Sequence, residues 1–124
     1  MNFGSLINKA IVLFELPQHN NYKHFSFIIK RNRIISLGWN LQKKTDTFAH
    51  KFKYKHPFIH SELMAIKNFP YPPTELYKCK MINIRLNNNK QLRLSKPCKN
   101  CQNLLNFFEL KEIWYSHNNG FKLL

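Results

Sequence analysis

The sequence carries four side chains whose types and spacing could bind a metal ion and move protons beside it. His60 and Glu62 form an H-x-E triplet, and Cys98, 38 residues after His60, begins a C-x-x-C motif that ends at Cys101. One imidazole and two thiolates supply three zinc ligands and leave the fourth tetrahedral position open for water, as in catalytic rather than structural sites. Zinc lowers the pKa of its bound water towards about 7, and Glu62 could exchange a proton with that water.

Local sequence favours the same chemistry. Cys98 and Cys101 are three residues apart, so they face the same way on the first turn of a helix, which Pro97 is well suited to open. The N-terminus of that helix favours the thiolate form of both cysteines. Each residue alone has an ordinary structural explanation, and it is their joint occurrence that predicts a catalytic zinc centre. A zinc-stabilised binding module without catalysis is the alternative from a different class, and it leaves Glu62 without a role.

The rest of the sequence predicts the elements that would position these residues. Apolar residues at helical spacing predict helices, and β-rich or alternating runs predict strands. Helices are expected over residues 5–14, 59–69 and 98–110, and strands over 24–30, 33–40, 81–86, 113–116 and 121–124. The stretches 41–57 and 87–97 are predicted to be loops. The order α-β-β-α-β-α-β-β predicts an α/β fold with a mixed sheet of about five strands flanked by helices.

Length and composition indicate one folded domain over residues 1–124. Hydrophobic residues make up 44% of the chain and charged residues 21%, which is typical of a globular protein. No secretory signal and no apolar run of about 18 residues is evident, so we expect a cytoplasmic protein with no membrane partner. The three cysteines are an odd number, which argues against a disulfide framework, and Cys79 is expected to be a buried or half-buried thiol without a catalytic role.

The charge of the chain permits two interpretations. Twenty Lys and Arg against six Asp and Glu give a net charge of +14, which favours encounter with nucleic acid or phosphorylated small molecules. An A/T-biased genome would enrich Lys together with Asn, Phe and Ile and produce the same charge without a functional demand. The charge is spread along the chain, so it does not by itself identify a partner.

The two motifs resemble those of the cytidine and deoxycytidylate deaminase superfamily of zinc-dependent nucleobase deaminases. The resemblance covers most of the chain, from the predicted hairpin to the C-terminal strand, and implies that family's three-layer fold, its Zn²⁺ cofactor and its hydrolase activity. It makes His60, Cys98 and Cys101 the zinc ligands and Glu62 the proton shuttle. In that scheme zinc-bound hydroxide attacks C4 of cytosine, and uracil and ammonia are the products.

The same resemblance implies three substrate contacts. Asn40, at the end of a G-W-N segment, would hold the sugar hydroxyl. The backbone around Ser61 would recognise the pyrimidine amide edge, and the carbonyl of Lys96 would meet the leaving amine. Ser61 stands where the family usually has alanine. The chain also lacks the helix that some members carry between the last two strands, so those strands are expected to pair antiparallel.

Two substrate classes fit these residues. The leading hypothesis is a free cytosine nucleoside or nucleotide, which belongs to nucleotide metabolism. Basic residues that could hold its phosphate are Arg31, Arg85, Arg93 and Lys96. The alternative is cytosine or adenine in single-stranded DNA or RNA, with the basic surface along the backbone and bases stacked on Phe48, Phe52 and Tyr54. Because many relatives are oligomers, the resemblance also makes a homo-oligomer an option.

Overall fold

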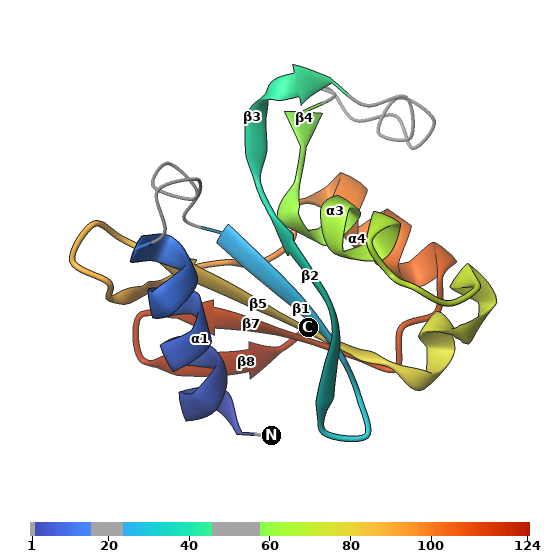
Figure 1. The fold of residues 1–124 in the computed structure, drawn as a ribbon, viewed down its shortest axis with the longest axis horizontal. Helices are drawn as coiled ribbons and strands as arrows, with labels where there is room; N and C mark the ends of the chain where they lie inside the picture. The colour runs from blue at the N-terminus through green and yellow to red at the C-terminus, as the bar shows by residue number, and fades with distance from the viewer. Residues whose placement is uncertain (1, 16–23, 46–57) are drawn as a thin grey trace.

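The computed structural model describes residues 2–15, 24–45 and 58–124, and Figure 1 shows how they are arranged. The elements in chain order are α1 (Phe3–Glu15), β1 (His24–Lys30), β2 (Arg33–Trp39), β3 (Leu41–Thr45), β4 (Phe58–Ile59), α3 (Ser61–Lys67), the 3₁₀ helix η2 (Pro73–Lys78), β5 (Lys80–Leu86), β6 (Leu92–Arg93), α4 (Lys99–Phe107), β7 (Glu112–His117) and β8 (Gly120–Leu123).

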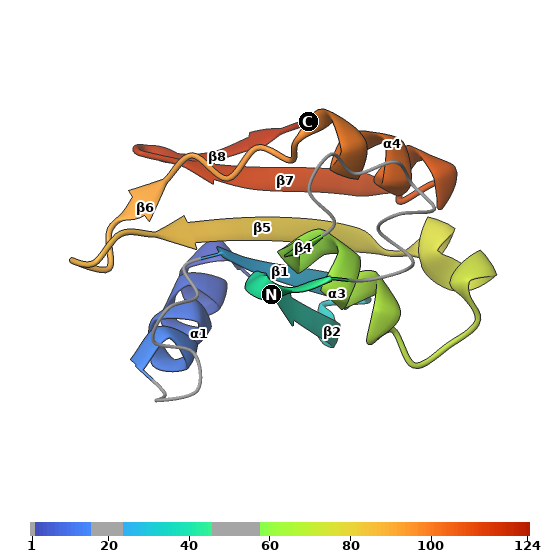
Figure 2. The ribbon, with the colours of Figure 1, turned by 90° about the horizontal axis from the view of Figure 1, so that it is seen from above.

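One six-stranded sheet forms the centre of the structure. Five strands follow the order β2-β1-β5-β7-β8, and β6 pairs with β5 off this path. The β5–β7 pair is parallel and the other pairs are antiparallel, including β7 with β8. Figure 2 shows β5 between β1 and β7, and β3 with β4 forms a separate two-stranded sheet. The predicted mixed α/β fold and the antiparallel pairing of the last two strands are therefore confirmed.

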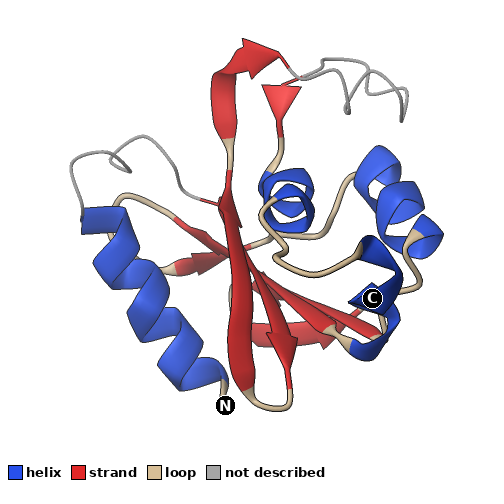
Figure 3. Ribbon diagram, turned by 45° about the vertical axis from the view of Figure 1, so that its right-hand side comes forward, coloured by secondary structure: helices blue, strands red, loops and turns tan. Residues whose placement is uncertain are grey.

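Helices cover both faces of this sheet and give it three layers (Figure 3). Leu6 of α1 is buried on one face, in a cluster with Phe25 and Phe27 of β1. Ile28 lies in a second cluster with Leu63 of α3 and with residues of α4. Successive side chains of a strand point to opposite faces, which is why β1 contributes to both clusters. Both faces of β1 are therefore buried.

The turn between β1 and β2 explains their register. Arg31 and Asn32 form a two-residue connection with φ of 51° and 62°. Two positive φ values are typical of a type I′ turn, whose twist matches that of the strands it joins. Lys30 therefore pairs with Arg33, and the predicted hairpin is confirmed.

Three short elements lie where the sequence predicted none, and Ile59, predicted to begin a helix, lies in β4, so that α3 begins at Ser61. The predicted loop 41–57 begins with the strand β3, whose polar sequence lacks apolar alternation and which pairs through Leu41 with Ile59; residues 46–57 lie outside the described residues. The predicted loop 87–97 contains β6, which a turn organised by the Asn87 side chain brings back against β5. The third is η2, which begins at Pro73, where a fixed φ favours the first turn of a helix.

Cys79 lies immediately after η2 and is fully buried in the cluster beneath α3 and α4, which confirms its predicted burial. Burial raises the pKa of its thiol. Among the described residues, no helix has the length and apolar character needed to cross a lipid bilayer.

Candidate metal centre

The starts of α3 and α4 carry the predicted zinc ligands. His60 is the N-cap of α3, with an extended backbone at φ −78° and ψ 156°. It was expected within the first turn and instead immediately precedes it. Cys98 is the N-cap of α4, at φ −64° and ψ 166°, and its sulfur accepts a hydrogen bond from the backbone N–H of Cys101 at 3.4 Å. The C-x-x-C motif thus caps its own helix and holds both sulfurs on one side of it.

Close packing of α3 on β2 fixes the height of His60 above the sheet. Gly38 of β2 faces α3, and a Cβ there would collide with the carbonyl oxygen of Ser61 and the backbone nitrogen of Ala65. Ser36, two residues earlier on the same strand, donates a hydrogen bond to the carbonyl oxygen of Ala65 at 2.5 Å. The absence of a side chain at position 38 is therefore what lets the helix approach.

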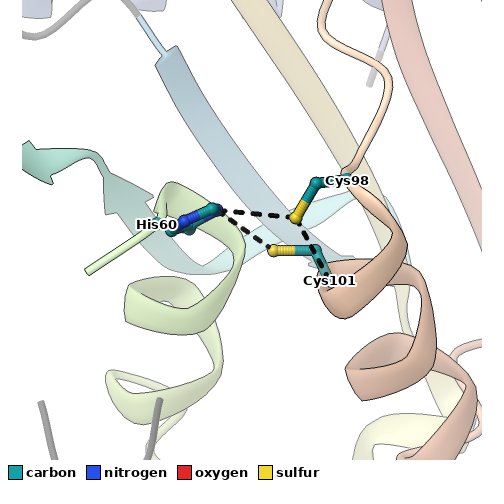
Figure 4. A group of neighbouring side chains, drawn as sticks. All are labelled: His60, Cys98 and Cys101. Carbon is teal, nitrogen blue, oxygen red and sulfur yellow. Dashed lines mark hydrogen bonds between the residues drawn. The ribbon is translucent and has the colours of Figure 1, made fainter. Parts of the chain in front are cut away.

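The three predicted ligands converge, as Figure 4 shows. Nδ1 of His60 lies 3.8 Å from Sγ of Cys98 and 3.5 Å from Sγ of Cys101, and all three ligand atoms lie within 4.8 Å of one another. Tetrahedral zinc with ordinary Zn–N and Zn–S bond lengths separates a nitrogen and a sulfur ligand by about 3.6 Å. The donor set and these separations fit a zinc ion.

Electrostatics favour the ligand form of Cys98. Its hydrogen bond with the Cys101 side chain, followed by contacts with His60 and the Cys101 backbone N–H, lowers the pKa of Cys98 to about 4 against an opposing effect of burial. Cys98 is therefore a thiolate at neutral pH. The hydrogen bond between His60 and the Cys98 sulfur raises the pKa of His60. A proton thus competes with a metal ion for the imidazole.

Glu62 is buried behind these ligands, with 6% of its surface exposed. The hydroxyl of Ser61 donates to its Oε1 at 3.0 Å, and the amide Nδ2 of Asn83 donates to its Oε2 at 3.1 Å. Burial is the largest influence on this carboxyl and raises its pKa, while His60 and Cys98 are close enough to act on it electrostatically. Glu62 is thus a carboxyl group placed close to His60 and Cys98, with its pKa shifted towards the protonated form.

A buried set of polar side chains lies under Glu62, and the sequence analysis did not single it out. The hydroxyl of Ser26 on β1 lies 2.7 Å from Oδ1 of Asn83 on β5 and 2.8 Å from the Ser61 hydroxyl. Ser95 donates to the backbone carbonyl of Asn83 at 2.9 Å and contacts the hydroxyl of Ser116 on β7. In the sequence, Ser26 and Asn83 each interrupt an otherwise apolar strand with a polar residue. That interruption could have indicated a buried polar set.

Asn40, just after β2, contacts His24 at the start of β1. Oδ1 of Asn40 accepts a hydrogen bond from the backbone N–H of His24 at 3.2 Å, so one end of this amide has a structural role. Burial, followed by the charges of Arg85 and His60, lowers the pKa of His24 to about 4. His24 is therefore neutral at pH 7 and lies within electrostatic range of a predicted ligand.

The other predicted substrate contacts are dispersed. Ser61 is buried beside Glu62, whereas Lys96 is exposed two residues before Cys98. Arg85 pairs with His24 across the strands, while Arg31 lines a pocket formed at the opposite end of β1. Nη1 of Arg93 donates a hydrogen bond to the carbonyl of Leu92. The aromatic residues Phe48, Phe52 and Tyr54 lie outside the described residues.

No protein-family model matches the chain, and no curated protein matches it. Among solved structures, the chain is similar to a cytidine deaminase from Burkholderia pseudomallei with a TM-score of 0.61 and 15% sequence identity, over 100% of this chain and 92% of that one. At this identity the likeness shows the fold alone. The chain therefore has a cytidine deaminase-like fold in which a His-Cys-Cys group could hold a metal ion.

Proposed function

We propose that this protein is a zinc-dependent hydrolytic deaminase that converts cytosine to uracil in a free nucleoside or nucleotide. The observation that carries the proposal is the convergence of His60, Cys98 and Cys101 beside the buried carboxyl of Glu62. Three protein ligands leave a tetrahedral ion one open position, and a proton-carrying group beside them is what hydrolysis requires.

His60, Cys98 and Cys101 would hold the zinc ion. When bound, zinc polarises a water molecule and makes a nucleophile available near neutral pH. Glu62 would take a proton from the attacking water at a carboxylate oxygen as the C–O bond forms at C4 of the base. It would pass that proton to the ring nitrogen, then take the remaining hydroxyl proton at C4 and pass it to the amino group as the C4–N bond breaks. The balance is cytosine plus water giving uracil plus ammonia.

The raised pKa of Glu62 suits this exchange. A group that accepts a proton in one step and releases it in the next works best when its pKa lies closer to the working pH than that of an exposed carboxyl. Burial provides that shift in the direction needed. The hydrogen bonds from Ser61 and Asn83 hold the carboxyl in one orientation while its proton changes.

Three residues are proposed to bind the substrate. Asn40 would bind the sugar hydroxyl through the amide atoms that its contact with His24 leaves available. The backbone at Ser61 would meet the amide edge of the pyrimidine, and the carbonyl of Lys96 would accept a hydrogen bond from the leaving amine. The cytidine substrate of the similar solved structure supports a cytosine nucleoside as the first compound to test.

Single-stranded nucleic acid is the second candidate substrate, and one observation favours it. A pocket of about 660 Å³ at the far end of β1 has five basic residues among the eight that line it. The chain as a whole has 20 basic residues in 124, so this pocket is strongly enriched. Its basic residues are Lys30, Arg31, Lys78, Lys80 and Lys111.

Ammonia release from zinc-loaded protein tests the proposal. The substrates are cytidine, deoxycytidine, their monophosphates, adenosine, and single-stranded DNA and RNA, and Glu62→Gln is the blank. Turnover of a free nucleoside or nucleotide that is lost in Glu62→Gln supports the proposal. Turnover only on strands supports the second candidate, and zinc binding without any turnover contradicts both.

A further inference from the structure

Glu62 receives hydrogen bonds from side chains in two different layers of the fold. Ser61, which donates to Oε1, is its neighbour on α3, so this contact moves with the helix. Asn83, which donates to Oε2, belongs to β5 at the centre of the sheet. Only the second contact ties the carboxyl to a part of the molecule outside its own helix.

The amide of Asn83 is itself oriented by other groups. Its Oδ1 accepts a hydrogen bond from the Ser26 hydroxyl at 2.7 Å, so its Nδ2 is the end that faces Glu62. Ser95 holds the Asn83 backbone through the 2.9 Å hydrogen bond to its carbonyl. Asn83 is 2% exposed and Ser26 is fully buried, so water does not compete for these contacts.

A buried asparagine in a central strand needs a reason, because an amide removed from water costs free energy unless its hydrogen bonds are made. An apolar residue at position 83 would extend the cluster formed by Met81 and Ile113. It would also leave Oε2 of Glu62 without its donor. The side chain at this position therefore serves the carboxyl and not the core.

From this geometry we infer that Asn83 is a positioning residue for Glu62, with Ser26 orienting its amide, in the reaction of the proposed function on which the inference rests. Asn83 touches neither substrate nor metal ligand in this role. It fixes the direction of the carboxyl so that one oxygen can face the reacting atoms, which is the kind of support that catalytic groups need from their neighbours.

The test combines kinetics with a measurement that needs no turnover. In zinc-loaded Asn83→Ala we expect kcat to fall about 10- to 100-fold, the effect of losing one hydrogen bond to a charged group, with KM changed less than about twofold. Asn83→Asp, which keeps the volume and removes the donor, should lose at least as much. Ser26→Ala should fall between these variants and wild type. Ser116→Ala, which removes a buried hydroxyl of the same polar set without touching Glu62, is the matched control and should keep kcat.

The second readout is the ¹³C resonance of the Glu62 carboxyl in protein labelled at glutamate. The chain has five glutamates, and Glu62→Gln identifies the resonance by its loss. We expect it to move in Asn83→Ala and in Asn83→Asp and to stay in place in Ser116→Ala. An unmoved resonance, or a loss of kcat equal to that of the control, overturns the inference. If wild type turns over no substrate, the proposed function fails, and the resonance still decides the role of Asn83.

Discussion

At the scale of single residues, Cys98 and Cys79 offer a matched pair for testing metal binding. Both are cysteines, but Cys98 faces His60 while Cys79 is buried in the core. In Cys98→Ala we expect zinc affinity to fall at least about 100-fold, since even partners of metal ligands contribute 10- to 100-fold. In Cys79→Ala the bound zinc should stay at one ion per chain. Metal analysis after dialysis against a zinc buffer distinguishes the two, and equal loss in both variants would contradict the assignment.

Glu62 has a second testable property in its dependence on pH. Its contacts with Ser61, and through Ser26 to Asn83, form a closed ring of hydrogen bonds. The Ser61 hydroxyl donates to Oε1 of Glu62 and lowers the pKa of the carboxyl, against the effect of burial. Burial is the larger influence on the Glu62 carboxyl, so the net shift of its pKa favours the protonated form.

The sign of this effect follows from the direction of the shift. Burial raises the pKa of Glu62 above its ordinary 4.5, so its contribution to stability is complete below pH 4.5 and is lost as pH rises towards the folded pKa. Metal-free wild type should lose up to about 1.4 kcal/mol per pH unit in that window relative to Glu62→Gln, which stays neutral. Urea unfolding of both proteins between pH 4.5 and 7 measures it. If the unfolding free energies of the two proteins change equally with pH, the pKa of Glu62 is not raised by folding.

Sequence alone predicted the three candidate metal ligands that the structure brings together, but not the polar side chains around Glu62. His60, Cys98 and Cys101 stand in fixed spacings that follow from the first turns of helices. Asn83 stands in a strand whose alternation says only that it shares a face with Met81 and Arg85. What lies opposite that face depends on where α3 packs, and this is a property of tertiary structure.

At the scale of elements, Gly38 controls how α3 sits on the sheet. Gly38→Ala places a Cβ against the backbone of Ser61 and Ala65, which cannot swing aside as a side chain could. We expect a loss of about 1–3 kcal/mol in unfolding free energy together with weakened zinc binding, because the helix that carries His60 must move.

Gly4 in α1 is the matched control for that substitution. The nearest atom to a Cβ at Gly4 would be the side-chain oxygen of Asn2 at 3.5 Å, an ordinary contact. Gly4→Ala should therefore stabilise the protein by up to about 1 kcal/mol through helix propensity and leave zinc binding unchanged. Thermal unfolding and zinc titration test both variants, and a Gly38→Ala protein with wild-type zinc affinity would contradict this role for Gly38.

The main elements were predictable because their signals are local. Apolar residues at helical spacing predicted α1, and the β-rich runs predicted the β1–β2 hairpin, whose Arg31–Asn32 turn then fits the strands' twist. The short elements were not predictable, since β3 is polar and takes its strand geometry from β4, and β6 is a two-residue strand that returns against β5 across a turn. The two residues of β6 are too few to show a periodic pattern of apolar residues.

At the scale of the whole molecule, the basic pocket and the group formed by His60, Cys98 and Cys101 lie at opposite ends of β1. His24 is within electrostatic range of His60, whereas Lys30 lines the pocket, and six residues of strand separate them by about 20 Å. For the described residues, Lys30 and Lys111 have no acidic partner within salt-bridge distance, while Lys80 pairs with Glu112 at 3.5 Å. The pocket is thus a separate source of positive potential.

This separation distinguishes the two candidate substrates. In the double variant Lys30→Ala/Lys111→Ala we expect turnover of free cytidine to be unchanged, because the pocket is too far away to contact a nucleoside at the metal. Binding of a single-stranded oligonucleotide should weaken, and its salt dependence should fall by about 0.7 in log–log slope for each contact removed. Fluorescence anisotropy at several salt concentrations measures the slope. A loss of cytidine turnover in the variant would contradict the separation.

The exposure of Cys98 also makes the metal-free protein sensitive to oxidation. Its thiolate is exposed and has a pKa of about 4, which is the form that peroxide oxidises to a sulfenic acid. Cys101 is three residues along the chain, with its sulfur within 4.8 Å, so a sulfenic acid at Cys98 would condense with it to a disulfide. A metal ion and peroxide would compete for the same sulfur electron pair. Zinc supply would then set the protein's lifetime under oxidative stress as well as its activity.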